Sequence, residues 1–310
     1  MKGNNNNDMA LHTYNHIDIC AGTGMLGEAV KIALDGRIRT ACYVEWEAYA
    51  SATLVARMAD KTLDNAPIWD DVHSITGTEF SNFMDRVLRP ICVTAGYPCQ
   101  PFSVAGKRAG ENDPRHLWPA ISAFVERNKP ELCFFENVSG HLRLGFDTVC
   151  ADLERMGYAI AAGLFTAAEV GAAHKRERLF ILAHTKREGR DGRSKSEQDR
   201  LHILTGSSKS FMANAEVSRS ERTVSARYGE TERCATERSR IPLFAPAPDH
   251  AEAWHKILAI NPSVEPAVCR DAYGLANRVD RLRLTGNGVC TLAASYAFLS
   301  LAATIEEYLT

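Results

Sequence analysis

Residues 15–184 alternate short apolar runs with segments of helical periodicity, and this alternation limits the fold more than any other feature. The apolar runs are HIDIC, TACYVE, ICVTAG, ELCFFEN and RLFILA, at residues 16–20, 40–45, 91–96, 131–137 and 178–183. Amphipathic segments lie between them, at residues 27–34, 47–58, 117–128 and 146–157. Strands that alternate with helices of this length form parallel crossover units, so we predict an α/β fold with helices on both faces of one sheet.

Two glycines follow the first apolar run, in DICAGTGMLGEAV at residues 18–30. Gly22 and Gly24 let the backbone approach a bound nucleoside at the open start of a helix, with a plain tight turn as the alternative. The third glycine of the dinucleotide fingerprint is absent, which counts against NAD. Glu45 ends the second run, where a carboxylate commonly accepts from a ribose, and Asp71 follows the third expected strand, where it can accept from an adenine amino group. These strand ends favour an adenosine-containing cofactor, whereas a helix-capping glutamate and a solvated loop aspartate are the alternatives.

The stretch TAGYPCQPFSVAGKR places Cys99 in a turn directly after a strand, where a thiol can be presented to a substrate. Glu136 emerges from the apolar LCFF run, where a carboxylate is costly unless it is paired or functional. Arg176 and Arg178 are two residues apart, so in a strand they share one face. A thiol, a carboxylic acid and two arginines fit nucleophilic chemistry, because arginines lower the pKa of a nearby thiol. A buried structural cysteine, an N-capping glutamate and a surface arginine pair are the alternatives.

Composition excludes several classes of protein. The 310 residues are 45% hydrophobic and 24% charged, as in an ordinary soluble globular protein. No apolar stretch approaches the ~18 residues of a membrane span, so no membrane association is expected. The nine cysteines are scattered without a CxxC pair, which favours free thiols in a reducing, cytoplasmic setting and no metal site.

The ordered set DICAGTG, VEW, DDV, GYPCQPFS, ENV, KRER and GNGV resembles the cytosine-5 DNA methyltransferase family of the prokaryotic or phage type. The resemblance covers roughly residues 16–184 and 278–300, and the succession of PCQPFS, ENV and RER is its most specific part. It implies a Rossmann-like, S-adenosylmethionine-dependent methyltransferase sheet with a small target-recognition insert. The implied location is the cytoplasm of a bacterial or phage-infected cell.

The resemblance also implies catalytic roles. Cys99 would attack carbon 6 of a cytosine flipped out of the duplex, while Glu136 protonates or hydrogen-bonds ring nitrogen 3. Carbon 5 would then take the methyl group. Arg178 would contact the cytosine carbonyl and Arg176 the flipped nucleotide or its backbone, and residues 100–116 would form the loop that closes over the DNA.

Residues implied to bind the cofactor lie at the strand ends and in the return segment. They are Asp18, Ala21, Gly22, Gly24, Glu45, Trp46, Asp71, Val72, Pro98, Leu117 and Asn287. Trp46 would stack on or beside the adenine, with a plain core aromatic as the alternative. The sequence departs from the family at Cys20, where an aromatic residue is usual, and at Met25, where a second glycine is usual, so the shape of the cofactor pocket is expected to differ.

Composition changes after residue 184. Residues 185–240 are rich in Arg, Ser and Glu, poor in large apolar residues and locally basic, which predicts a polyanion-binding face or a solvated loop region. We expect the chain to be divided into four parts: 1–14, a disordered tail; 15–184, the catalytic domain; 185–249, the target-recognition region; and 250–310, a return segment that ends in a long helix.

The expected partner is double-stranded DNA, with a cognate restriction nuclease as a second partner and the protein acting as a monomer. An RNA (tRNA) cytosine-5 methyltransferase shares the same motifs and is the first alternative function. A catalytically silent DNA-binding regulator is the second, although the intact Cys99 and Glu136 speak against it.

Overall fold

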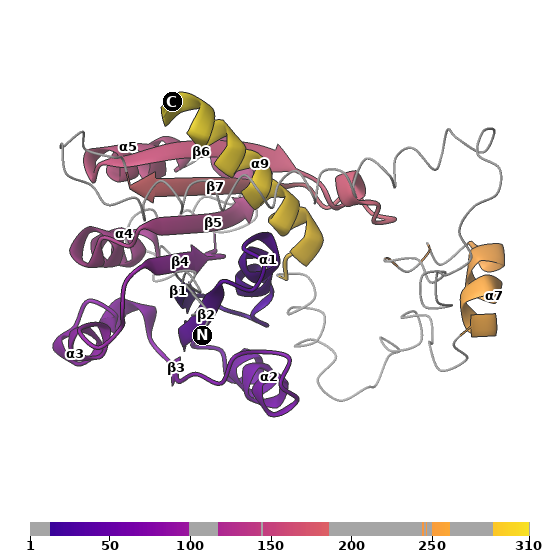
Figure 1. Cartoon of the computed structure of the whole chain (residues 1–310), viewed down its shortest axis with the longest axis horizontal. Coiled ribbons are helices and arrows are strands. Elements are labelled where there is room, and N and C mark those ends of the chain that lie inside the picture. The colour runs from indigo at the N-terminus through magenta and orange to yellow at the C-terminus, as the bar shows by residue number, and fades with distance from the viewer. Residues whose placement is uncertain are drawn as a thin grey trace, which may run out of the picture.

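The computed structural model describes residues 13–98, 117–143, 145–185, 250–260 and 288–309, together with residues 244 and 246. Within these ranges the side chains of residues 260 and 306–309 are not described. The described residues build a sheet with helices on both sides (Figure 1). The predicted recognition region and the predicted closing loop at 100–116 therefore lie almost entirely outside the described residues.

Seven strands form one mixed sheet. They are β1 Tyr14–Ile19, β2 Ile38–Val44, β3 Ile68–Trp69, β4 Ile91–Ala95, β5 Leu132–Val138, β6 Tyr158–Phe165 and β7 Arg178–Thr185. Their order is β3-β2-β1-β4-β5-β7-β6. Strands β1 to β5 pair in parallel, whereas β7 is antiparallel to both β5 and β6. The strand order reverses direction between β1 and β4, and ligands of open α/β sheets bind at the carboxyl ends of the strands at such a point.

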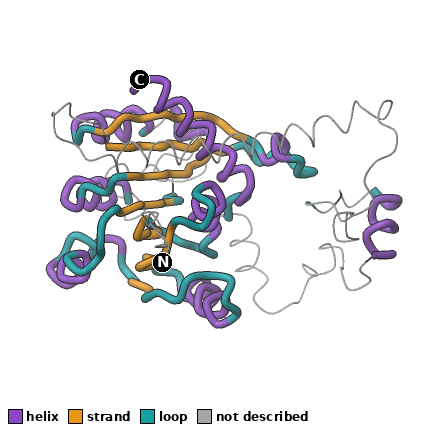
Figure 2. Tube along the Cα trace, in the orientation of Figure 1, coloured by secondary structure: helices purple, strands orange, loops and turns teal. Residues whose placement is uncertain are grey.

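Helices cover the two faces of the sheet, as the tube view in Figure 2 also shows. They are α1 Met25–Ala33, α2 Ala48–Ala59, α3 Thr78–Met84, α4 Trp118–Asn128, α5 Phe146–Arg155 and α9 Thr291–Leu309. A further helix, α7 Ala251–Ile260, is drawn apart from the sheet (Figure 1). One buried cluster joins the sheet to α3, α4 and α5 through Phe80, Phe124 and Leu153. A second joins the opposite face to α1 and α9 through Val30 and Phe298. Among the described residues, no helix has both the length and the apolar character needed to cross a membrane.

The predicted alternation of strands with helices is confirmed from β1 to β5. The predicted parallel arrangement is wrong for β7, which is antiparallel to β5 and β6. Each predicted apolar run forms a strand, and β1 begins at Tyr14, one residue before the expected start of the catalytic domain. Strand β6 was not predicted, because YAIAAGLF is rich in small residues and lacks a clear alternation. The chain returns from β6 to β7 through the short 3-10 helix Ala167–Val170, too short for a helical crossover, so β7 runs antiparallel.

A buried polar chain lies beneath α1. Thr94 Oγ1 donates to Asp18 Oδ1 at 2.6 Å, and His16 Nε2 lies 2.7 Å from the same hydroxyl. The Thr94 hydroxyl has one proton, which it donates to Asp18, so it must accept from His16 Nε2. His16 Nδ1 then carries no proton and accepts from Thr40 Oγ1 at 3.1 Å. Burial lowers the pKa of His16 to about 3, mainly through the desolvation of its charged form. His16 is therefore neutral, with its proton on Nε2.

His16→Gln should change how stability depends on pH. The folded pKa of His16 is depressed, so its contribution is fully present above the unfolded value of 6.5 and is lost as pH falls. Between pH 7 and pH 5 the stability of the wild type should fall relative to His16→Gln by about 2 kcal/mol. Burial raises the pKa of Asp18 to about 7 and gives the opposite trend, but Asp18 is present in both proteins. Denaturant unfolding at both pH values measures the difference.

The exposed His73 provides the control for this measurement. His73→Gln should follow the wild type at both pH values. A stability difference between wild type and His16→Gln that is the same at pH 7 and pH 5 would contradict the neutral, buried state of His16.

Candidate active site

The turn between β1 and α1 has an unusual backbone. Cys20, Gly22 and Gly24 have φ values of 54°, 56° and 78°, in the left-handed region that glycine tolerates best. A Cβ on Gly24 would lie 2.9 Å from Leu63 Cδ1, whereas a Cβ on Gly22 would meet no heavy atom within 4 Å. Glycine is therefore required at 24 by close packing as well as by φ. Open space lies beside Gly22, where a ligand can approach the backbone.

Glu45 holds this turn from the end of β2. Its Oε2 accepts from the backbone N–H of Gly22 at 2.7 Å, and its Oε1 accepts from the N–H of Glu47 at 2.8 Å. Burial raises the pKa of Glu45, and hydrogen bonds from the backbone of Glu47, Gly22 and Trp46 oppose the rise. A carboxylate has about four acceptor directions, so Glu45 can still accept from a hydroxyl. The helix begins at Ala48, so Glu45 is a buried turn-anchoring group and not a surface cap.

Trp46 is 77% exposed, which excludes the core-aromatic alternative. The Asp71 carboxylate accepts from the N–H of His73 at 2.8 Å and caps the short 3-10 helix Val72–Ser74. Val72 packs into the buried cluster on the α4 side of the sheet. These three residues follow β2 and β3, so they lie at the same edge of the sheet as Gly22.

Asp18 and Ala21 are buried at the base of the same turn. Asp18 Oδ2 would be 3.1 Å from a Cβ on Gly27, so this carboxyl group lies beneath the first turn of α1. Its role as a direct cofactor ligand stays a prediction.

The segment that leads to Cys99 is anchored by β5 and the turn after it. Asn137 Nδ2 donates to the carbonyl of Tyr97 at 3.2 Å, and the Tyr97 hydroxyl lies 3.3 Å from His141 Nε2. Tyr97 is buried against the rings of Trp118 and His141, at centroid distances of 5.7 and 5.8 Å. Pro98 follows and is exposed. The backbone that presents Cys99 is therefore fixed up to the residue before it, and Cys99 itself lies outside the described residues.

Glu136 and Arg178 form a buried ion pair beside that segment. Arg178 Nε lies 2.9 Å from Glu136 Oε1, and the two side chains are 19% and 10% exposed. Glu136 Oε2 would lie 3.4 Å from a Cβ on Gly96, which places the carboxyl group over the end of β4. Desolvation raises the pKa of Glu136 to about 7, against the opposing effect of Arg178 and Arg176. Glu136 lies within β5, so the N-capping alternative is wrong.

Arg176 has a different setting from the one expected. Strand β7 begins at Arg178, so Arg176 precedes the strand, with φ 34°, and the alternation argument does not apply to it. Its Nη2 donates to the carbonyl of Gly288, and its positive charge acts on Glu136. Arg176 thus connects Glu136 to the return segment at Gly288, the residue after Asn287.

The structure brings most of the predicted residues to one edge of the sheet. Glu136, Arg176 and Arg178 are in mutual electrostatic contact. Leu117 immediately precedes α4 and packs on the buried cluster, while Asn287, like Cys99, lies outside the described residues. Within the described residues no group of three or more His, Cys, Asp and Glu side chains is arranged to hold a metal ion.

Sequence reasoning missed Thr94 and the pairing of Tyr97 with His141. The one signal for that pairing was a histidine three positions after the ENV motif, since a buried histidine requires a polar partner.

The antiparallel β7 and a glycine turn facing a buried glutamate mark a Rossmann-like fold that can bind a nucleoside. A family model described as C-5 cytosine-specific DNA methylase matches residues 14–241, which is most of the chain. The chain belongs to this family. Its cofactor is accordingly S-adenosylmethionine, as expected from the sequence.

Curated relatives cover the chain in part. The type II methyltransferase M.AplI of Arthrospira platensis is 40% identical over 103 residues, 32% of this chain and 30% of that protein. M.NgoBI of Neisseria gonorrhoeae is 25% identical over 234 residues, 73% of this chain and 64% of that protein. The matched part of the chain thus spans less than two thirds of these relatives. The S. pombe Dnmt2 structure covers 94% of this chain at 17% identity with a TM-score of 0.56, and it shares the fold.

Arg178→Met should raise the pKa of Glu136 further above its value of about 7, by about 1 unit or more, because an adjacent positive charge favours the carboxylate. Carboxyl ¹³C NMR titration of glutamate-labelled protein measures it, with Glu136→Gln to assign the resonance. Arg155→Met is the control, since Arg155 pairs with Glu126 on the surface. An unchanged titration in Arg178→Met would contradict the ion pair.

Proposed function

We propose that the protein is a DNA cytosine-5 methyltransferase that transfers a methyl group from S-adenosylmethionine to carbon 5 of a flipped cytosine through a covalent Cys99 adduct. The observation that carries the proposal is the buried Glu136, whose pKa is raised to about 7. Glu136 lies over the end of β4, where its Oε2 would be 3.4 Å from a Cβ on Gly96. Gly96 precedes Cys99 by three residues. A carboxylic acid that keeps its proton near neutral pH, beside a nucleophile, is what attack on a cytosine ring requires.

Glu136 supplies the proton in this proposal. The Cys99 thiolate adds to carbon 6 and pushes the electron pair of the 5,6 double bond toward ring nitrogen 3, which takes the proton of Glu136 or its hydrogen bond. Carbon 5 becomes nucleophilic and takes the methyl group, whose former carrier would be left as a neutral thioether, and ring nitrogen 3 returns its proton to Glu136. Loss of the carbon-5 proton to a base then expels the thiolate and restores the ring. Arg178 holds Glu136 in place through Oε1 and leaves Oε2 directed toward Gly96.

The described residues fit the cofactor. S-adenosylmethionine supplies, when bound, a methyl group on a positively charged sulfur. Open space beside Gly22 allows close approach to the backbone, and the Glu45 carboxylate can accept from a ribose hydroxyl. The exposed ring of Trp46 offers a face for the adenine. The cofactor side and the base side meet where β1 and β4 lie next to each other.

Glu136→Gln should lower kcat by roughly 10²-fold or more, because an amide cannot deliver a proton to ring nitrogen 3. In the wild type, activity should decline as pH rises above about 7, since the raised pKa leaves Glu136 deprotonated there. Single-turnover methylation between pH 6 and pH 9 measures both effects. Glu79→Gln, an exposed carboxylate on α3, is the control and should keep the wild-type profile. A Glu136→Gln rate equal to wild type would exclude the acid role.

Cys99→Ser should abolish covalent trapping. Duplex DNA that carries 5-fluorocytosine cannot lose fluorine as a proton, so a cytosine-5 enzyme remains attached through its nucleophile. The wild type with S-adenosylmethionine should form a complex that survives a denaturing gel, and Cys99→Ser should form none. Trapping on 5-fluoro-substituted tRNA but not on DNA would support the RNA enzyme instead. Trapping on neither would overturn the proposed function.

The biological setting is also part of the proposal. The curated relatives carry the name type II methyltransferase, which supports a modification role beside a cognate restriction nuclease. We propose a cytoplasmic monomer that reads its site through residues 185–249, where Lys and Arg can bind phosphates.

A further inference from the structure

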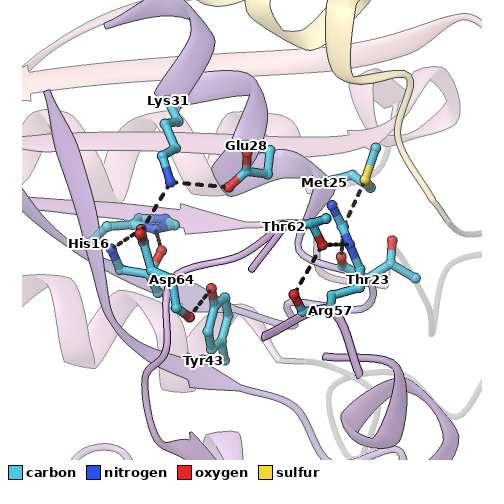
Figure 3. A network of polar contacts seen from close by, with 10 residues as sticks. His16, Thr23, Met25, Glu28, Lys31, Tyr43, Arg57, Thr62 and Asp64 are labelled. Atoms are coloured by element: carbon cyan, nitrogen blue, oxygen red, sulfur yellow. Dashed lines mark hydrogen bonds and ion pairs between the residues drawn. The ribbon is translucent and has the colours of Figure 1, made fainter. Parts of the chain in front are cut away.

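Arg57 extends from the last turn of α2 to the glycine turn. Its Nη1 donates to the carbonyl of Thr23 and lies 3.1 Å from the sulfur of Met25 (Figure 3). Thr23 and Met25 flank Gly24, whose φ is 78°. One guanidinium therefore contacts both sides of the residue at which the turn becomes a helix. The resemblance to the family implies a glycine at the position of Met25, so the sulfur contact depends on a residue that departs from the usual family sequence.

The guanidinium of Arg57 is itself held in place. Its Nε lies 3.4 Å from Thr62 Oγ1, and the Arg57 carbonyl accepts from the N–H of Thr62 at 2.9 Å and from its hydroxyl at 3.1 Å. The next residue, Leu63, packs against Gly24. The end of α2 and the turn that follows it thus form a support behind the glycine turn.

Fixing the Thr23 carbonyl fixes the glycine turn, because a peptide group is planar. When the Thr23 carbonyl is held, the Gly24 N–H of the same peptide keeps its direction toward Ala21 O, at 2.7 Å. On the other side of the turn, Glu45 holds the N–H of Gly22 at 2.7 Å. The open space beside Gly22 lies between these two anchors. Without them, residues 22–24 would sample many conformations, since glycine has few steric limits.

We propose that Arg57 is a positioning residue of the cofactor site, which holds the glycine turn in the conformation that receives S-adenosylmethionine. The inference rests on the proposed function, because it assigns the turn to that cofactor. Arg57 acts through Thr23 and Met25 and has no contact with the reacting atoms. Arg57 orders the glycine turn before the cofactor binds, so the free energy of binding does not include the entropy lost in ordering that turn.

The test compares Arg57→Met, which keeps most of the stem and removes the donors, with Arg57→Lys, which keeps the charge and one donating group. Calorimetric titration should show a Kd for S-adenosylmethionine that is about tenfold higher in Arg57→Met and less than that in Arg57→Lys. The KM for the cofactor should rise in parallel, while kcat at saturating cofactor and the Kd for DNA stay at wild-type values. Arg39→Met, an exposed arginine on β2, is the control and should match the wild type.

Amide hydrogen exchange gives a readout that does not require the cofactor. In the free protein, the Gly24 amide should exchange faster in Arg57→Met than in wild type or in Arg39→Met. Unchanged exchange or an unchanged Kd in Arg57→Met would overturn the proposal, as would an equal fall in kcat and DNA affinity. If Arg57→Met does not fold, Thr62→Val replaces it, since this change removes the hydroxyl that contacts Arg57 Nε. The Kd for S-adenosylmethionine and the exchange rate of the Gly24 amide should then both rise, by less than in Arg57→Met. A wild type that binds no S-adenosylmethionine would overturn the proposed function, and the exchange experiment would still decide whether Arg57 holds the turn.

Discussion

Parallel pairing of β1 with both β2 and β4 is the constraint on which the site depends. Parallel strands end at the same edge of the sheet, so the turn after β1, Glu45 after β2 and the Tyr97–Pro98 segment after β4 lie together although they are far apart in sequence. The helix α1 that follows β1 packs on one face of the sheet, whereas the helix α3 that precedes β4 packs on the opposite face. The crevice that results is the place where open α/β sheets bind ligands, and here it brings the glycine turn after β1 next to the segment that leads to Cys99.

Buried charge is retained at this edge at an energetic cost. Glu136 and Glu45 are both shielded from water, and burial raises the pKa of each. Their environments differ in what opposes that rise. Two backbone N–H groups hold Glu45 as an acceptor, whereas two arginines hold Glu136 close to the point where it gains or loses a proton at neutral pH. A buried carboxylate that is useful as an acid and one that is useful as an acceptor thus differ in their partners and not in their burial.

The sequence predicted most of the sheet, because its strands follow from local patterns, and the candidate residues that the structure describes lie at one edge of that sheet. Apolar runs such as ICVTAG and ELCFFEN have the length and the β-branched or aromatic content of buried strands. Strand β6 was missed, since its alanines and Gly163 carry no alternation, and the reversed direction of β7 depends on a connection whose length is only evident in three dimensions. The pairing of Arg57 with Thr23 was also unpredictable. It joins two segments 34 residues apart, and no spacing rule links the end of one helix to the turn before another.

The hydrogen bond from Arg176 to the carbonyl of Gly288 spans 112 residues of chain. It joins the segment before β7 to the segment before α9, so the chain that leaves the sheet at Thr185 returns to a point already attached to it. The free energy of closing a loop grows only by about 0.6 kcal/mol for each doubling of its length. Insertions, deletions or replacement of the intervening segment would therefore change the stability of the sheet little. The proposed recognition region at 185–249 falls within this closed loop, so its length and sequence can change without loosening the two ends of chain that frame the site.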